Sequence, residues 1–298
     1  MKPLEITVLG SGSIVPTKDR NHAAFWIQRE GDAFLWDCGE GAQKQLQKAE
    51  LSFMKIDRIF ITHWHADHFA GLIGMIESFN LEGRERKLEI YGPEASRFVS
   101  ILSDLSWYDF GFDIEAVDVE FESEDEELLV EEDEYVIKAI PSEHSVPSVA
   151  YCLEEKDSWN INKEKAAEKG LYPGPEMQEL KDRGRIQHEG KTITLEEVAD
   201  LTEGRKVVYS GDTLPSENVK KIAEDADLLI HDATFVNERS HNHSSAEDAG
   251  KLAKEANVRK LLLTHYSRRY KNLTPLKEAA EKHHDNVDVA RDLMKLEI

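Results

Sequence analysis

The sequence predicts an α+β fold, within the broader α/β class, in which two β-rich layers are covered on the outside by helices. Two observations predict it. Short β-like runs punctuated by glycine are followed by runs with helical spacing, and this order occurs twice along the chain. The length of 298 residues, 40% of them hydrophobic, is also enough for one large core or two modest ones. We expect a single domain spanning residues 1–298.

The elements are taken in chain order. The first part has strands at 5–9, 23–28, 33–36 and 58–62, and a helix at 41–49. Residues 69–79 have the helical spacing of Leu72, Met75, Ile76 and Phe79, and a strand at 87–91 and a helix at 93–105 follow. The later part has strands at 134–140, 148–153, 206–209, 227–231 and 260–263, and helices at 216–224, 245–256 and 274–283.

The formal net charge of −22 is concentrated in one acidic segment. Residues 113–134 hold 13 carboxylates and no lysine or arginine, which leaves −9 for the remainder of the chain. The carboxylates alternate in part with Val117, Val119 and Phe121, which favours solvated β-hairpins with one acidic face over a disordered loop. Such an excess also suits a protein that stays soluble in high salt, which is a hypothesis about habitat.

Residues 154–203 differ from the rest of the chain. This stretch is polar, and residues 163–191 contain seven basic and six acidic side chains around a run rich in glycine and proline at 170–175. A nearly neutral piece inside a strongly acidic chain is predicted to be an inserted arm that projects from the core. An ordinary surface excursion is the alternative.

A compact group of metal-binding residue types follows the strand at 58–62. Three histidines and an aspartate fall within six residues, at His63, His65, Asp67 and His68. Two imidazoles two residues apart on a tight loop can face one metal, and Asp67 and His68 then point toward a neighbouring site. Imidazole nitrogens and carboxylate oxygens suit zinc best, with manganese or iron as alternatives.

Three further donors come directly after predicted strands, namely His144, Asp212 and His265. Each alone would more often be a capping or core residue than a ligand, but their occurrence beside the first cluster reverses that preference. We therefore expect two metal ions. One is held by His63, His65 and His144, the other by Asp67, His68 and His265, and Asp212 bridges the two.

The cysteine content and the chain start bear on the cellular compartment. Cys38 and Cys152 are the only cysteines, so no disulfide framework is implied and a reducing cytoplasm fits. The first ten residues lack the apolar run of a signal peptide, and the longest apolar runs are too short to span a bilayer. We expect a cytoplasmic protein with no membrane partner.

Several motifs extend the pattern along nearly the whole chain. They occupy residues 10–13, 16–21, 37–41, 63–68, 210–213, 231–235, 243–245 and 263–270. Together they resemble the metallo-β-lactamase superfamily and, within it, the ribonuclease Z family. The resemblance implies an αββα sandwich with a dinuclear site at one edge. It also implies a zinc-dependent endonuclease that holds two ions per subunit and removes the 3′ trailer from precursor tRNA.

The same resemblance assigns roles to individual residues. Two metals close together can lower the pKa of bound water and stabilise both oxygens of a phosphodiester displacement. Asp67 is expected to accept the proton of the attacking water, and His243 to protonate the leaving 3′ oxygen. Asp232, where the family more often has glutamate, would hold His243 in the right tautomer. Arg269 is expected to bind the scissile or adjacent phosphate.

RNA contacts are expected in two places. The arm carries Pro173, Gly174 and Pro175, which resemble the Gly-Pro motif with which the family's arm grips the tRNA elbow, and its lysines and arginines are expected to bind phosphates. Nearer the metals, the expected RNA-binding residues are Lys18, Arg20 and Ser267. The family resemblance implies a homodimer in which each arm serves the partner's active site.

Two other functions compete with this prediction. A hydrolase of a small ester, lactone or phosphodiester would need the metal ligands but neither the arm nor the loop at 16–21. A non-catalytic RNA-binding relative is disfavoured because all the expected ligands are present. The remaining histidines, which we interpret as surface or structural residues, are His22, His188, His231, His241, His283 and His284.

Overall fold

The structure is a computed structural model that describes residues 3–106, 109–238 and 242–298. The described chain forms two compact units. The larger unit comprises residues 3–130, 137–153 and 206–298, and the smaller unit comprises residues 131–136 and 154–205. Among the described residues, no helix is long and apolar enough to cross a membrane.

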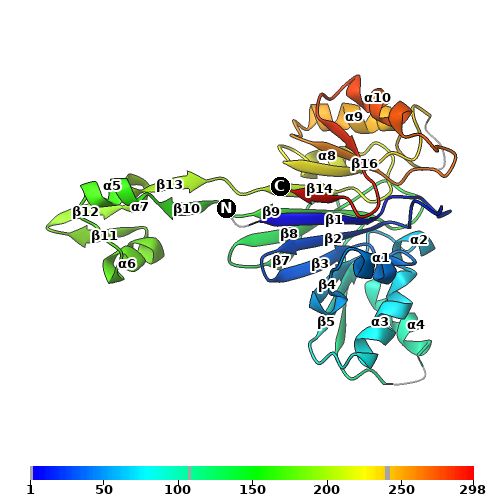
Figure 1. Cartoon of the computed structure of the whole chain (residues 1–298), viewed down its shortest axis with the longest axis horizontal. Helices are drawn as coiled ribbons and strands as arrows, with labels where there is room; N and C mark the ends of the chain where they lie inside the picture. Colours follow the sequence, from blue (N-terminus) through cyan, green and yellow to red (C-terminus); the bar gives the residue numbers. More distant parts are fainter. Residues whose placement is uncertain (1–2, 107–108, 239–241) are drawn as a thin grey trace. The chain divides into compact units, whose positions relative to one another are not determined.

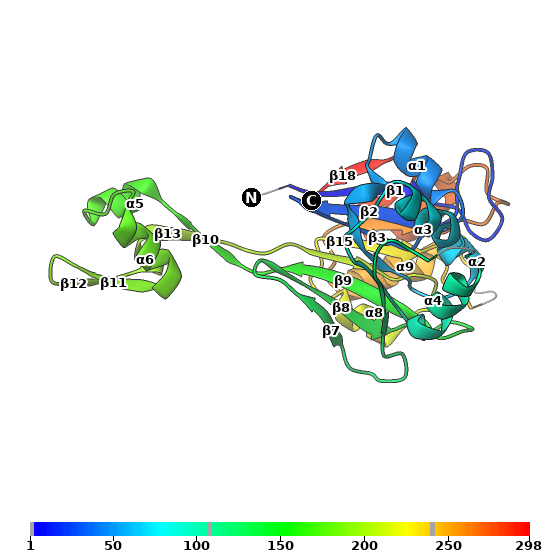
Figure 2. The same ribbon diagram turned by 90° about the horizontal axis from the view of Figure 1, so that it is seen from below.

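The first large sheet has seven strands in the order β18-β1-β2-β3-β4-β5-β6. Their bounds are β1 Leu4–Gly10, β2 Ala24–Arg29, β3 Asp32–Trp36, β4 Ile56–Phe60, β5 Leu88–Gly92, β6 Ile114–Asp118 and β18 Lys295–Glu297. β1 pairs antiparallel with both β2 and β18, which lie beside it in both views of the fold (Figures 1 and 2). From β3 to β6 the neighbouring strands run parallel.

The second large sheet has seven strands in the order β17-β16-β15-β14-β9-β8-β7. Their bounds are β7 Glu127–Glu131, β8 Tyr135–Pro141, β9 Val149–Glu155, β14 Lys206–Tyr209, β15 Leu228–Asp232, β16 Leu261–Thr264 and β17 Val287–Val289. β14 to β17 run parallel. Buried aromatic rings connect the two sheets: Tyr209 of β14 stacks on Trp36 of β3 with ring centroids 6.0 Å apart, and Phe60 of β4 meets Tyr151 of β9 at 5.4 Å.

Helices cover the outer face of each sheet in the larger unit (Figure 1). The first sheet is covered by α1 Ala42–Lys48, α2 Ala66–Phe69, α3 Gly71–Leu81 and α4 Ala95–Asp104, with the short 3-10 helix η1 Phe53–Lys55 nearby. The second sheet is covered by α8 Glu217–Ile222, α9 Ala246–Glu255 and α10 Thr274–Glu281. The apolar side of α3 that its spacing predicted, Leu72, Met75, Ile76 and Phe79, is buried. The predicted αββα sandwich is confirmed.

The smaller unit has secondary structure and an apolar cluster of its own. β10 Ser158–Ile161 pairs antiparallel with β13 Ala199–Thr202, and β11 Arg185–His188 pairs antiparallel with β12 Lys191–Thr194. The helices are α5 Lys163–Glu168, α6 Pro175–Arg183 and α7 Leu195–Val198. Leu171, Leu180, Ile193 and Val198 are among its buried residues.

Two expectations about strands fail. The acidic segment does not form hairpins throughout, because β6 is the edge strand of the first sheet whereas β7 is the edge strand of the second. Of the strands in and next to the acidic segment, β7 and β8 are consecutive neighbours in one sheet, whereas β6 and β7 are not. β17 and β18 were not expected. Each has only three residues, too few for a recognisable pattern, and is a strand because it pairs with β16 or β1.

Candidate metal centre

The candidate ligands lie where strands of both sheets end. Parallel strands bring their carboxyl ends to one edge, where side chains from distant parts of the chain can meet. β3, β4, β8, β14, β15 and β16 each end at or within three residues of one of the following side chains: Asp37, His63, His144, Asp212, Asp232 and His265. Asp67 and His68 are buried in the short helix α2 that follows β4.

Three imidazole nitrogens converge at the first candidate position. His65 Nδ1 lies 3.0 Å from His63 Nε2 and 3.2 Å from His144 Nε2. Asp212 completes a group in which one ligand atom from each residue lies within 4.8 Å of the others. The convergence of nitrogens is the arrangement expected of ligands to one cation.

The hydrogen bonds behind two of these rings leave their converging nitrogens without protons. His144 Nδ1 donates to the backbone carbonyl of Asn242 at 2.9 Å, so Nε2 keeps its lone pair. The Thr62 hydroxyl donates its proton to Asp37 and therefore accepts from His63 Nδ1 at 3.1 Å. His63 Nε2 is then also a free lone pair. Two lone pairs facing a third nitrogen favour a bound cation.

The second candidate position is formed by Asp67, His68 and His265. His265 Nε2 lies 3.3 Å from Asp67 Oδ2, and His68 Nε2 lies 3.7 Å from the same oxygen. His68 Nδ1 donates to Asp37 Oδ2 at 2.6 Å, so Nε2 is the nitrogen that faces the site. That nitrogen is buried and has no hydrogen-bond partner. Burial lowers the pKa of His68, but the charges of Asp212 and Asp37 prevail and raise it.

Asp212 lies between the two groups. Its Oδ1 is 3.3 Å from His68 Nε2, and its Oδ2 is 3.3 Å from His265 Nε2 and 3.8 Å from His63 Nε2. Oδ1 is buried without a hydrogen-bond partner. The preceding Gly211 has φ +59°, and a Cβ there would lie 2.8 Å from Thr62 Cβ. Glycine thus lets the Asp212 turn approach the strand end that carries His63.

The electrostatic environment favours neutral imidazoles at the first position. Burial lowers the pKa of His63, His65 and His144. Burial alone would raise the pKa of Asp67, but the neighbouring His265 and His68 outweigh it and lower the pKa to about 2. Neutral imidazole and ionised carboxylate are the forms in which these side chains bind metals.

His243 lies beside the second group, and with Asp212, Asp232 and His265 it forms a third set of side chains close enough to hold a metal. Its Nδ1 is 2.9 Å from Asp232 Oδ2 and 3.7 Å from Asp212 Oδ2. Burial lowers the pKa of His243, but the charge and hydrogen bond of Asp232 prevail and raise it to about 9. Asp232, although shorter than the glutamate that the family more often has at this position, is thus long enough to hydrogen-bond His243 directly.

Asp37 and Asp232 hold the surrounding histidines in the same manner from different sheets. Asp37 binds His68 directly and His63 through the Thr62 hydroxyl. Asp232 binds His243 directly, and the Thr234 hydroxyl donates to it at 2.7 Å while accepting from His265 Nδ1 at 2.9 Å. Sequence reasoning missed Asp37, Thr62 and Thr234. Asp37 carried the same signal as Asp212, an acidic residue directly after a buried strand.

The other expected site residues lie in several places. Arg269 is exposed, sits over the Phe235 ring at 5.0 Å and lies 3.8 Å from Glu238. Ser267 follows His265 and is partly exposed. Lys18 and Arg20 line a surface pocket beyond the metal centre. Pro173, Gly174 and Pro175 are exposed in the smaller unit. His241 lies outside the described residues, and His231 is fully buried.

The arm's cations are not all available for RNA. Lys165 pairs with Asp200, Lys169 with Glu197, and Arg183 with Glu179. Within the described part of the chain, Lys163, Lys181, Arg185 and Lys191 have no ion-pair partner. Four of the seven cations therefore remain for a ligand.

The donor set fits divalent metal ions. It supplies nitrogens without protons, ionised carboxylates and two buried polar atoms that have no partner, His68 Nε2 and Asp212 Oδ1. Unpaired buried polar atoms are costly, and a cation satisfies both. Mixed nitrogen and oxygen donors match zinc, with manganese or iron as alternatives.

Comparisons with known proteins agree with this geometry. A family model described as a beta-lactamase superfamily domain matches residues 176–266, and one described as the anti-Pycsar protein Apyc1 matches residues 4–99. Among solved structures, the human short-form tRNase Z is 28% identical over 98% of both chains, with a TM-score of 0.70. The metallo-beta-lactamase fold protein YhfI of Bacillus subtilis, at 20% identity, covers 100% of both chains with a TM-score of 0.72 and supports the fold alone.

Curated relatives match over almost the entire length. Ribonuclease Z of Methanosarcina acetivorans is 42% identical over 99% of this chain and 98% of its own. Ribonuclease Z of Methanothermobacter thermautotrophicus is 41% identical over 99% of this chain and 97% of its own. Identity at this level over both full lengths, together with the converging ligands, shows that the chain belongs to the ribonuclease Z family.

Proposed function

We propose that this protein is a metal-dependent endoribonuclease that removes the 3′ trailer from precursor tRNA with two zinc ions per chain. The convergence of seven predicted ligands carries the proposal: they make up two of the three groups of side chains in the described residues that are close enough to hold a metal, and the third group combines Asp212 and His265 with Asp232 and His243. His63, His65 and His144 would hold one ion, Asp67, His68 and His265 the other, and Asp212 both. When bound, two such ions lower the pKa of water to about 7 and stabilise both oxygens of a phosphodiester displacement.

Two residues of the chain move protons in this proposal. Asp67 is ionised, and its Oδ2 lies 3.3 Å from His265 Nε2. In the proposal, this carboxylate accepts the proton of the attacking water. His243 donates a proton to the leaving 3′ oxygen through Nε2, because Asp232 occupies its Nδ1. Arg269 binds a phosphate near the cut, and its exposed position leaves its guanidinium accessible to RNA.

The smaller unit supplies a second contact with the substrate. Tyr172 beside the Pro173–Gly174 turn is 69% exposed, and Lys163 and Lys181 line the adjacent 420 Å³ pocket. Exposed aromatic and cationic groups together suit an RNA surface. The arm, proposed to span residues 154–203, would bind a part of the tRNA that is distant from the cleavage site.

Assembly and location are part of the same proposal. The family resemblance supports a homodimer, which light scattering coupled to size-exclusion chromatography would test. Both cysteines are free and buried, which is compatible with the reducing cytoplasm.

The decisive experiment uses a precursor tRNA with a 3′ trailer. The purified protein is incubated with it in zinc or manganese, and the 3′ end of the product is mapped. We expect one cut that releases the trailer. Hydrolysis of bis(p-nitrophenyl) phosphate without cutting of the precursor would instead support a small-molecule hydrolase.

A further inference from the structure

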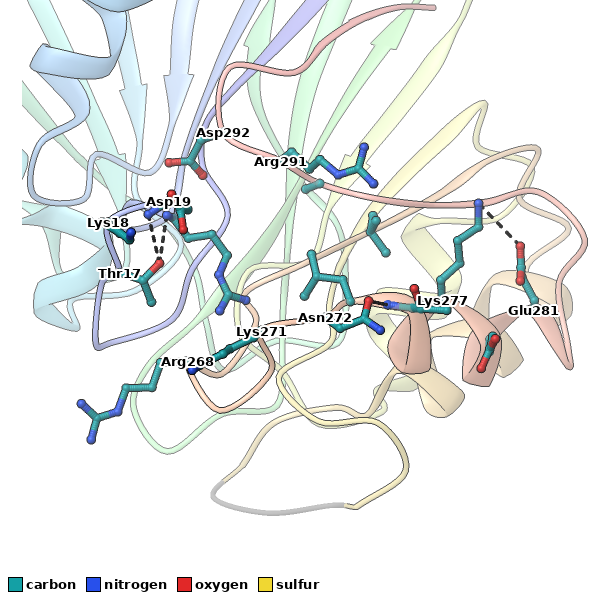
Figure 3. Close-up of a pocket in the computed structure, with 16 residues that line it drawn as sticks. Thr17, Lys18, Asp19, Arg268, Lys271, Asn272, Lys277, Glu281, Arg291 and Asp292 are labelled. Carbon is teal, nitrogen blue, oxygen red and sulfur yellow. Dashed lines mark hydrogen bonds and ion pairs between the residues drawn. The ribbon is translucent and has the colours of Figure 1, made fainter.

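A large surface pocket of the larger unit lies beyond the metal centre. Its volume is 990 Å³, at the upper end of the range for ligand sites of about 300–1,000 Å³. Four segments far apart in sequence form it: the loop at 17–20, the loop at 268–273, helix α10 and the segment at 289–292 (Figure 3).

The pocket is cationic in a strongly acidic protein. Six of its side chains are basic and four are acidic, whereas the whole chain carries −22. The basic residues are Lys18, Arg20, Arg268, Lys271, Lys277 and Arg291. In Figure 3, Lys277 and Arg291 lie across the pocket from Lys18, and Arg268 extends away from them.

Most of these cations have no carboxylate partner. Within the described ranges, Lys18, Arg268, Lys271 and Arg291 form no ion pair, and all four are exposed. Lys277 lies 3.6 Å from Glu281, and both are about 40% exposed, so that pair contributes little. In a chain with 59 acidic residues, a cluster of free cations is a site that a polyanion can occupy.

Arg20 contributes a donor that lacks an acceptor. Its Nη2 donates to the carbonyl of Tyr270 at 2.9 Å, which connects the loop at 17–20 to the loop at 268–273. Its Nη1 is buried and has no hydrogen-bond partner. A buried guanidinium nitrogen without a partner is costly, and an anion oxygen would satisfy it.

One of the pocket's carboxylates is already occupied. Asp292 accepts hydrogen bonds from the Ser11 backbone and hydroxyl, from the Asn21 backbone at 2.7 Å and from Gln45 Nε2 at 2.9 Å. Through Ser11 and Asn21, Asp292 therefore fixes the two ends of the chain segment that contains the loop at 17–20. Its charge is partly compensated by these donors, which reduces its repulsion of an anion in the pocket.

The pocket is connected to the metal centre through one loop. Arg268 comes three residues after the candidate ligand His265. Between them, Tyr266 donates its backbone N–H to the Ser11 carbonyl at 3.1 Å, and its carbonyl accepts from Ser13 at 3.2 Å. The loop that carries a metal ligand thus continues directly into the cationic lining.

We infer that this pocket binds backbone phosphates of the RNA that flank the scissile bond, with Lys271, Lys277 and Arg291 as contacts in addition to the loop cations Lys18 and Arg20. The inference rests on the proposed function for the identity of the polyanion. It places a track of positive charge from the metal centre to α10. A negatively charged enzyme can then bind RNA, because the local charge is opposite to the overall charge.

The test removes three cations that lie outside the catalytic residues. The triple variant Lys271→Ala, Lys277→Ala, Arg291→Ala is compared with wild-type holoenzyme for binding of fluorescein-labelled mature tRNA at several salt concentrations. We expect the affinity to fall on the order of tenfold or more, and the slope of log Kd against log salt to decrease by about 2. With precursor tRNA, KM should rise more than kcat falls.

Two control variants separate charge from structure. Lys271→Arg, Lys277→Arg, Arg291→Lys keeps every charge and should retain wild-type affinity. Lys254→Ala removes an exposed cation on α9 that lies outside the pocket, and it should change neither Kd nor salt slope. Metal content and melting temperature verify that the triple alanine variant is folded and loaded.

The outcomes distinguish this inference from the proposed function. If wild-type cuts precursor tRNA and the triple alanine variant keeps its Kd and salt slope, the pocket does not bind RNA and the inference is wrong. Loss of inorganic phosphate binding with unchanged tRNA binding would also overturn it, by showing a small-anion site. If wild-type binds tRNA through the pocket without cutting the precursor, the proposed function fails, and of the inference only the binding of RNA phosphates by the pocket stands.

Discussion

The carboxylate of Asp37 accepts a 2.6 Å hydrogen bond from His68 Nδ1, and both residues are fully buried. Three other donors reach the same carboxylate: the Thr62 backbone, the Thr62 hydroxyl and the Tyr209 hydroxyl. Asp37 therefore fixes the ring of one candidate ligand and, through Thr62, that of His63. Such partners of metal ligands set the tautomer and orientation of the imidazole.

Replacing Asp37 tests this arrangement. An Asp37→Asn change puts an amide N–H₂ among four donors, so at least one of them loses its acceptor. We expect metal affinity to fall roughly 10–100-fold, measured by competition with a chromogenic chelator. Asp57→Asn is the matched control, because Asp57 is half-exposed, pairs with the buried Arg84 and the exposed Arg86, and is not among the candidate metal ligands or their hydrogen-bond partners. Unchanged metal affinity in Asp37→Asn would contradict the role of Asp37.

His243→Ala tests the proton donor. We expect kcat on precursor tRNA to fall about 10²–10⁴-fold while metal content stays the same. The loss should be much smaller on bis(p-nitrophenyl) phosphate, whose leaving group does not need a proton. Equal losses on both substrates would argue against a proton donor, and a drop in metal content would mark His243 as a ligand.

Removing the metal tests the candidate ligands together. Without cations, lone pairs and carboxylates face one another at 3.0–3.3 Å, which is unfavourable. Dialysis against a chelator should therefore abolish cleavage and lower the melting temperature, and zinc or manganese should restore both. Elemental analysis of the restored protein should give two ions per chain. A content of one metal ion per chain would contradict the proposal that Asp212 binds both ions.

Gly211→Ala tests the close approach of two strand ends. The added Cβ would lie 2.8 Å from Thr62 Cβ in a backbone with φ +59°, so we expect a loss of stability of about 1–3 kcal/mol and weaker metal binding. Gly74→Ala is the control. It lies inside α3 with no atom within 4 Å of its added Cβ, and should stabilise the protein by about 0.5–1 kcal/mol. Chemical denaturation measures both.

Deleting the arm tests the second RNA contact. The unit has its own buried cluster around Leu180 and Val198, so replacing residues 163–191 by a short glycine-serine linker should leave the larger unit folded. We expect cleavage of precursor tRNA to be lost and hydrolysis of bis(p-nitrophenyl) phosphate to continue. An unchanged rate on precursor tRNA would show that the arm does not contribute.

Much of the fold could be predicted because periodicity is local. The helix with Leu72, Met75, Ile76 and Phe79 and the strands that precede His63, Asp212 and His265 were all visible as apolar patterns. The three-residue strands β17 and β18 were not, because such short segments become strands only when a distant neighbour pairs with them. The acidic segment was misassigned for the same reason: its alternation does not specify which sheet each strand joins.

The candidate metal centre was likewise predictable where local sequence patterns identify residues, and not where only the folded chain brings them together. Residue types and strand ends identified the seven candidate ligands, but not the hydroxyl groups of Thr62 and Thr234, since threonine occurs commonly at strand ends for other reasons. Of the cationic pocket, only Lys18 and Arg20 were expected to bind RNA. Lys271, Lys277 and Arg291 are unremarkable singly, and only folding brings four distant segments together around one cavity.

The acidic segment has a further consequence through the positions of β6 and β7. Each is the last strand of its sheet, so its outer backbone groups are open to a strand from another molecule. Glu115 and Asp118 on β6 and Glu127 on β7 give both open edges the same sign of charge. Two copies of the protein therefore repel each other at the positions where intermolecular sheet growth would start. The acidic charge on these edges opposes such pairing, while the candidate metal ligands and the cationic pocket lie on loops and helices elsewhere in the larger unit.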